Sequence, residues 1–244
     1  MPVAGVVTSE QAPPSVRSDA GKRALDVMIA AALLALLAPV FAAVALLVAG
    51  GLGRPVLFRQ RRVGRHGELF EVIKFRSMLP PDPRRGLTGD ANRLTPLGRW
   101  LRSTSLDELP SLWNVLRGDM SLVGPRPLLP EYLSRYSPTQ ARRHEVRPGI
   151  TGLAQVRGRN GLSWEEKFDL DVEYVDRRSL LMDLSILGAT VRTVLRRDGI
   201  SAPGVATAPE FLGTPAGTAP TDAPEVTLST NPSGTVTAQQ GRRQ

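Results

Sequence analysis

Residues 103–127 read STSLDELPSLWNVLRGDMSLVGPRP, a stretch that joins two adjacent carboxylates to an arginine between prolines. Because Pro110 lacks an N–H group, it is accommodated in the first turn of a helix, so the pattern predicts a helix that begins near Leu106. Asp107 and Glu108 would then lie at the helix N-terminus, where unpaired N–H groups attract phosphate and favour ionised carboxylates. The stretch therefore predicts phosphate chemistry.

A purely structural interpretation of the two carboxylates stays open. Ser105 and Glu108 fit an S-x-x-E capping box, and acidic residues are common in first turns because they stabilise helices. The arginine favours a functional interpretation, since Pro125 fixes its own φ and Pro127 keeps Arg126 extended. A stiffly held guanidinium near a carboxylate pair predicts a site for phosphoryl groups and a divalent metal.

Residues 102–127 resemble the bacterial sugar transferase family, the monotopic polyprenol-phosphate phosphoglycosyl transferases. The resemblance continues in RPGITGLAQVRGRN at 147–160 and in WEEKF at 164–168, and it covers residues 22–204. The expected fold class is mixed α/β and helix-rich, with a single catalytic domain and an N-terminal re-entrant membrane hairpin. The protein would be a monotopic membrane protein.

Length and composition agree with one folded domain. The 244 residues are 41% hydrophobic, which is enough for one sizeable core, and the polar flanks are not expected to add a second. The formal charge of +8 predicts attraction to anions, which include nucleic acid, lipid headgroups and phosphorylated substrates. The chain has no cysteine, which excludes disulfides, thiolate nucleophiles and cysteine-bound zinc.

A long uncharged run occupies residues 27–52. A straight helix of this length would be roughly 39 Å long, enough to cross a bilayer core of about 30 Å, so a transmembrane helix is the plain interpretation. However, Pro39 lies in the middle, and basic residues such as Lys22 and Arg54 flank both ends. Because basic flanks tend to stay cytoplasmic, these features favour a hairpin that breaks at Pro39 and returns to the same side. The family resemblance implies the same mode.

The chain is expected to consist of a disordered lead-in at 1–20, the membrane hairpin at 21–53, a cytoplasmic catalytic domain at 54–204 and a disordered tail at 205–244. Within the catalytic domain the patterns predict a β-hairpin with strands at 55–58 and 69–75, a helix at 96–102, a helix that opens with a Ser163–Glu166 capping box, and a last helix at 180–197. Arg142 and Arg143 are expected to be solvated.

The resemblance implies transfer of a sugar-1-phosphate from a UDP-sugar to polyprenol (undecaprenyl) phosphate, giving a polyprenol-diphosphate sugar and UMP. This is the first membrane step of bacterial surface-glycan assembly. The expected location is the bacterial cytoplasmic (inner) membrane, with the catalytic domain on the cytoplasmic face. Membrane lipids and downstream glycosyltransferases are the expected partners beside the two substrates, and nucleic acid is not expected to bind.

The resemblance also assigns roles to residues. Asp107 would be the catalytic nucleophile and Glu108 would assist metal or proton handling, and both would hold the expected cofactor, Mg²⁺. Arg102, Arg126 and Asp183 would form the substrate-phosphate-binding set. For Asp183, which has apolar neighbours in the last helix, a structural ion pair remains an alternative.

Two other functions are weighed. Asp169 and Asp171 match the short D-x-D metal pattern of conventional nucleotide-sugar glycosyltransferases, but two residues apart on a helix they point about 200° away from each other. The other alternative is a basic membrane-anchored nucleic-acid-binding or scaffold protein, and nothing in the sequence supports it except the positive charge.

Overall fold

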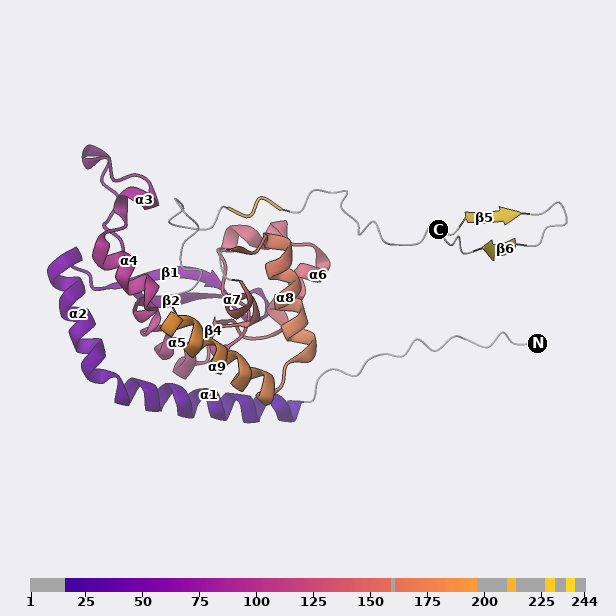
Figure 1. Ribbon diagram of the computed structural model, residues 1–244, viewed down its shortest axis with the longest axis horizontal. Helices are drawn as coiled ribbons and strands as arrows, with labels where there is room; N and C mark the ends of the chain where they lie inside the picture. The colour runs from indigo at the N-terminus through magenta and orange to yellow at the C-terminus, as the bar shows by residue number, and fades with distance from the viewer. Residues whose placement is uncertain (1–15, 159–160, 197–209, 214–226, 231–235, 240–244) are drawn as a thin grey trace. The chain divides into compact units, whose positions relative to one another are not determined.

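The computed structural model describes residues 16–158, 161–196, 210–213, 227–230 and 236–239. It divides into two units, residues 1–212 and 213–244, each treated separately below. In chain order the first unit contains α1 (Val16–Leu36), α2 (Ala38–Leu52), β1 (Leu57–Val63), η1 (Arg65–Gly67), β2 (Leu69–Phe75), η2 (Pro83–Arg85), α3 (Asp90–Arg93), α4 (Pro96–Ser103), η3 (Leu106–Glu108), α5 (Ser111–Arg117), β3 (Ser121–Val123), η4 (Pro130–Arg135), α6 (Pro138–Ala141), η5 (Arg142–Glu145), β4 (Gly149–Thr151), α7 (Leu153–Arg157), α8 (Trp164–Arg177) and α9 (Leu180–Arg196), where η marks a 3₁₀ helix (Figure 1). A helix-rich mixed α/β fold is confirmed.

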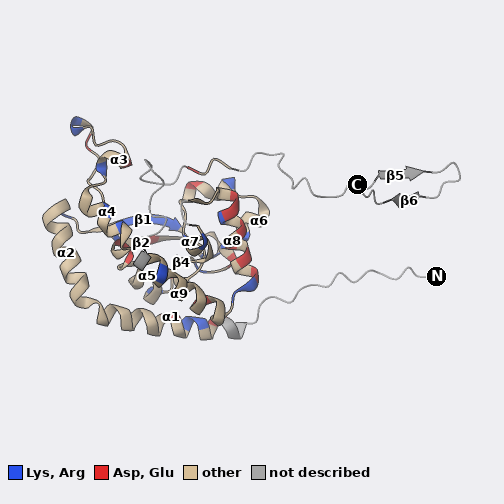
Figure 2. Ribbon diagram, viewed as in Figure 1, with Lys and Arg blue, Asp and Glu red and all other residues tan. Residues whose placement is uncertain are grey.

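The N-terminal apolar segment forms two helices with a bend between them. Among the described residues no single helix is long and apolar enough to cross a bilayer, but Asp19–Leu36 and Ala38–Leu52, bent by 64°, meet that requirement as a pair. Pro39 lies in the first turn of α2, where its missing N–H is tolerated. Figure 2 shows α2 and the second half of α1 without charged residues. The bend therefore lies where the sequence predicts a break.

The first half of α1 is anchored to the rest of the unit by polar contacts. Arg23 donates to the carbonyls of Val115 and Leu116 at the C-terminal end of α5, at 2.5 and 2.9 Å. The buried Asp26 carboxylate accepts bonds from Ser121 Oγ and from the Leu122 N–H. These bonds satisfy orphan groups at the end of α5 and along β3, so the polar half of α1 is part of the folded core.

Two small sheets support the site. β1 and β2 are antiparallel, with Leu57 opposite Phe75 and Val63 opposite Leu69. The second predicted strand has the observed bounds, whereas the first lies later than the predicted 55–58, because its apolar and basic residues alternate through to Val63. β3 and β4 form a parallel pair whose residues are almost all buried.

A helix begins at Leu106 as predicted, but it is a single 3₁₀ turn and not the start of an α-helix. Asp107 and Glu108 lie in the 3₁₀ turn η3, and α5 begins only after Pro110. Ser105 has φ of 57° and its side chain caps nothing, so the Ser105–Glu108 capping box does not form. The left-handed conformation of Ser105 ends the helical path of α4 before η3 begins, and it sets the direction of the turn that carries the two carboxylates.

The C-terminal part of the first unit differs from the prediction at one residue. The Ser163–Glu166 capping box of α8 is confirmed, and α9 has nearly the predicted bounds. However, Phe211, in the segment predicted as a disordered tail, is only 2% exposed and packs with Tyr132 and Phe168. One aromatic side chain packs in the core there, and the average composition of the tail does not predict the burial of a single residue. In the second unit β5 (Thr227–Thr230) pairs with β6 (Val236–Gln239), also against the prediction of a disordered tail, since Thr and Val favour extended pairing.

Candidate functional site

The candidate site centres on Glu108, which is paired with two cations from distant parts of the chain. Lys74 Nζ donates to Glu108 Oε1 at 2.5 Å, and Arg126 Nη2 donates to the same oxygen at 3.0 Å. Burial raises the pKa of Glu108, but Lys74 and then Arg126 outweigh it and hold the pKa at about 2. Glu108 is therefore ionised throughout the physiological range.

Asp107 has the opposite electrostatic behaviour. Its side chain is 8% exposed, and burial, followed by repulsion from Glu108, raises its pKa to about 6. Lys74, Arg102 and Arg126 lower the pKa of Asp107, so all three cations lie close enough to interact with this carboxylate. A carboxylate that is poorly solvated yet surrounded by cations suits nucleophilic attack on a phosphorus atom, because little water must be removed from it.

Local packing explains why β2 meets η3 and α5 here. Asn114, fully buried on α5, accepts from the Ile73 N–H at 3.0 Å and donates to the Glu71 carbonyl at 2.7 Å. Ser111 Oγ donates to the Ile73 carbonyl at 2.8 Å. These bonds join α5 to the backbone of β2 at Glu71 and Ile73, just before Lys74. As a result the ammonium group of Lys74 is held over Glu108.

Arg102 reaches the site from α4. Its Nε donates to Ser77 Oγ at 3.0 Å, and burial lowers the pKa of the guanidinium, while Asp107 and Asp90 raise it. The position agrees with the role that the resemblance assigns to Arg102, next to the carboxylate pair.

A cavity of about 40 Å³ opens beside these side chains. Its charged lining residues are Arg62, Lys74, Glu108 and Arg126, three cations to one anion. Burial and then repulsion from Arg126 lower the pKa of Arg62 to about 10, so the two guanidinium groups interact. A surplus of positive charge along a cavity favours an anionic ligand.

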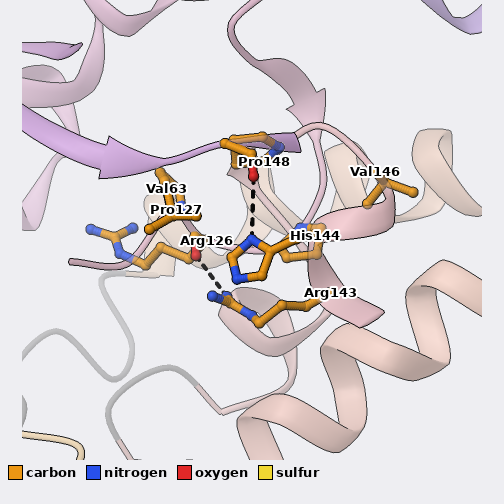
Figure 3. A pocket seen from close by; sticks show the side chains of 9 residues that line it. Val63, Arg126, Pro127, Arg143, His144, Val146 and Pro148 are labelled. Atoms are coloured by element: carbon orange, nitrogen blue, oxygen red, sulfur yellow. Dashed lines mark hydrogen bonds between the residues drawn. The ribbon is translucent and has the colours of Figure 1, made fainter. Parts of the chain in front are cut away.

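The loop that carries Arg126 is fixed through its backbone. The Gly149 N–H donates to the Pro125 carbonyl at 3.0 Å. Figure 3 shows the second bond, which Arg143 Nη2 donates to the Arg126 carbonyl at 2.7 Å. At Gly149 an added Cβ would lie 2.1 Å from the Gly124 nitrogen, so only glycine permits this approach. The loop is therefore rigid, as the two prolines predict.

Arg143 corrects one sequence-based expectation. It is 3% exposed rather than solvated, and it pairs with Asp171 at 2.7 Å. A run of two arginines in a polar segment reads as surface, and only the fold brings the buried carboxylate opposite the second one. The same pair argues against Asp171 as a metal ligand of a D-x-D site, because Arg143 already compensates its charge.

Asp183 lies elsewhere. Its Oδ2 accepts from Lys22 at 2.6 Å and its Oδ1 accepts from Tyr174 OH at 2.7 Å. This is a buried link between α1, α8 and α9, and it supports the alternative of a structural ion pair. The contacts join Asp183 to neither Asp107 nor Glu108.

The carboxylate pair fits a divalent metal. In the described part of the chain no three histidine, aspartate or glutamate side chains gather into a metal-binding group. Mg²⁺, however, typically takes one or two carboxylates and completes its shell with water and substrate phosphates. Burial, and then repulsion from Glu108, raise the pKa of Asp107, and a cation held by the two carboxylates would relieve that repulsion.

Sequence reasoning missed Lys74 and Arg62. Arg62 lies in β1 and Lys74 in β2, in the hairpin for which the sequence predicts strands but no site residue. The available signal was the position of Lys74 between two apolar residues of a strand. Ile73 and Phe75 are buried, and Lys74 between them is half-buried. A charge that shares a strand with core residues needs a partner.

The family model for bacterial sugar transferases matches residues 17–197. An uncharacterised sugar transferase, EpsL, of Bacillus subtilis is 55% identical over 163 residues, which are 66% of this chain and 81% of the relative.

Two further relatives have more descriptive names. A UDP-glucose:undecaprenyl-phosphate glucose-1-phosphate transferase of Caulobacter vibrioides is 44% identical over 197 residues, 76% of this chain and 73% of the relative. An undecaprenyl-phosphate galactose phosphotransferase of Salmonella typhimurium is 43% identical over 165 residues, 60% of this chain but only 35% of its own length.

Proposed function

This chain belongs to the bacterial sugar transferase family, and we propose that it transfers a sugar-1-phosphate from a UDP-sugar to undecaprenyl phosphate, giving undecaprenyl-diphosphate sugar and UMP. The relatives from Caulobacter vibrioides and Salmonella typhimurium are named for this type of reaction. The observation that carries the proposal is the convergence of Lys74, Arg102 and Arg126 on the Asp107–Glu108 pair.

Donor binding uses the cations. Arg126 presents a planar fork of donors that matches the diphosphate oxygens, and its pairing with Glu108 keeps that fork oriented before substrate arrives. Lys74 and Arg62 line the same cavity and add positive charge beside it. These groups stabilise the charge that develops on the phosphate as its bond to the sugar phosphate breaks.

Asp107 is the nucleophile in this proposal. One carboxylate oxygen attacks the β-phosphorus, a new P–O bond forms, and the bond to the α-phosphate oxygen breaks with its electron pair leaving on UMP. A phosphate oxygen of undecaprenyl phosphate then attacks the same phosphorus and releases Asp107 as a carboxylate. Each step exchanges one P–O bond for another, and neither requires a redox partner.

Mg²⁺ is the expected cofactor, held by Asp107 and Glu108, and it would supply Lewis-acid neutralisation of diphosphate charge. Glu108, ionised because of Lys74 and Arg126, keeps those cations in position.

The broken helix pair supports membrane association. Met28, Leu36, Leu46 and Leu47 on α1 and α2 are exposed large apolar side chains, which a lipid phase would cover. We propose that this pair enters the cytoplasmic leaflet of the inner membrane and returns, so that the lipid phosphate reaches the site at the interface. Anionic headgroups would meet exposed basic residues such as Arg54 and Arg59.

The test is a UMP-release assay with purified, detergent-solubilised protein, a panel of UDP-sugars, and undecaprenyl phosphate present or absent. Release of UMP with one UDP-sugar, dependent on Mg²⁺ and sustained only with lipid acceptor, is expected. Release of UDP in place of UMP would identify a conventional glycosyltransferase and refute the proposal.

A further inference from the structure

We propose that Phe211 is a positioning residue for Arg126: Glu210 and Phe211 close an aromatic cluster that supports the arginine loop of the site through Arg143. The inference rests on the proposed function, because Arg126 is taken there as the group that holds the donor diphosphate.

Phe211 is seated by its side chain and by its backbone. Its ring centroid lies 4.9 Å from that of Phe168 and 5.7 Å from that of Tyr132. The Phe211 N–H donates to Tyr132 OH at 3.2 Å, and Arg135 binds both the Phe211 carbonyl and the Glu210 carboxylate. The segment is thus docked at several points and does not merely lie on the surface.

The cluster that Phe211 completes covers Arg143. The Tyr136 ring stacks on Phe211 at 5.9 Å, and Tyr136 OH accepts from Arg143 Nη1 at 3.3 Å. The Arg143 guanidinium carbon lies 5.5 Å from the Phe168 ring and 5.7 Å from the Tyr136 ring. These rings exclude water from the ion pair between Arg143 and Asp171, which strengthens the bonds that Arg143 makes.

Arg143 in turn holds the backbone of the site loop. Figure 3 shows the Arg126 carbonyl joined to Arg143 while the Arg126 side chain points away from His144. One face of the Arg126 peptide is therefore fixed by Arg143, and the side chain extends to Glu108. If the aromatic cluster loses Phe211, water can reach Arg143 and compete for the Arg126 carbonyl, which loosens the loop.

Two neighbouring residues give a matched pair of variants. Phe211 is 2% exposed, whereas Leu212 is 80% exposed. We expect Phe211→Ala to raise KM for the UDP-sugar about tenfold with a smaller change in kcat, and Leu212→Ala to leave both unchanged. KM separates positioning from folding, because an unfolded fraction lowers the apparent kcat without altering KM.

A second measurement does not depend on the function. Hydrogen–deuterium exchange of the peptide that covers residues 124–128 should be faster in Phe211→Ala than in wild type and unchanged in Leu212→Ala. If Phe211→Ala does not fold, Phe211→Leu, which keeps apolar volume but loses the ring, takes its place with the same expectations.

A folded Phe211 variant with wild-type KM, or with wild-type exchange at 124–128, would overturn the inference. If wild-type protein releases no UMP from any UDP-sugar, the proposed function fails instead, and the exchange comparison still decides whether Phe211 orders the loop.

Discussion

Lys74 Nζ lies 2.5 Å from Glu108 Oε1, so a residue near the C-terminal end of β2 is paired with one of the two site carboxylates. Burial lowers the pKa of Lys74, and Glu108 raises it again. Each group makes the other's charge tolerable in a poorly hydrated position. The pair is the electrostatic centre around which Asp107 and Arg126 are arranged.

Replacing Lys74 should therefore damage the site more than the fold. We expect Lys74→Met to lower the rate of UMP release on the order of 100-fold, because Glu108 loses its nearest compensating charge and, among the described residues, keeps only Arg126 as a hydrogen-bonded cation. Lys74→Arg, which keeps the charge, is the control and should retain more activity. A Lys74→Met variant with near wild-type turnover would contradict this role.

Asp107→Asn should abolish turnover and any covalent adduct. The change preserves shape and removes the charged nucleophile. Wild type incubated with UDP-sugar alone should release UMP once per enzyme and carry a phospho-sugar on the peptide that contains Asp107, detected by mass spectrometry. If UMP appears only when polyprenol phosphate is present and no adduct can be trapped, direct attack by the lipid phosphate is the mechanism.

The same substitution should stabilise the fold at neutral pH. The pKa of Asp107 is about 6 in the folded protein against 3.8 for the ordinary group, so the folded state binds this proton more tightly than the unfolded state. Stability contributed by protonation is thus full below pH 3.8 and lost as pH rises through about 6.

The asparagine of Asp107→Asn cannot ionise, so this variant does not lose this stability as the pH rises. In metal-free protein its free energy of unfolding should exceed that of wild type by on the order of 3 kcal/mol at pH 8, and the difference should vanish well below pH 3.8. Urea unfolding at several pH values measures the difference. A constant difference across this range would show that ionisation of Asp107 is not its source.

Asp183→Asn should destabilise the protein without weakening donor binding. The buried pair with Lys22 is lost, which typically costs about 3–5 kcal/mol when one buried partner is removed. In the folded fraction KM for the UDP-sugar should be unchanged. A raised KM with normal stability would restore Asp183 to the substrate-phosphate-binding set.

The two ends of the broken helix pair should be labelled from the same side of the membrane. Lys22 is tied to Asp183 and is therefore unsuited to replacement, whereas Ala20 and Arg54 are exposed. Ala20→Cys and Arg54→Cys, made singly in a chain without cysteine, should both react with an impermeant reagent only in inside-out vesicles. Labelling from opposite faces would establish a single span.

The sequence by itself determined the elements whose causes are local. The Ser163–Glu166 box opens α8 because a side chain and a nearby N–H suffice. Pro39 lies at the bend between α1 and α2, and Pro125 and Pro127 stiffen the Arg126 loop, because proline acts on its own backbone and that of its neighbour.

Only the tertiary structure decided which charges meet. Lys74 and Glu108 are 34 residues apart, and Lys22 and Asp183 are 161 apart, so no spacing in the sequence relates them. Arg143 reads as a surface residue until Asp171 lies against it, and Phe211 reads as part of a polar tail until four aromatic rings surround it. A buried charge or ring is stabilised by partners that distant segments supply, and the fold alone brings those segments together.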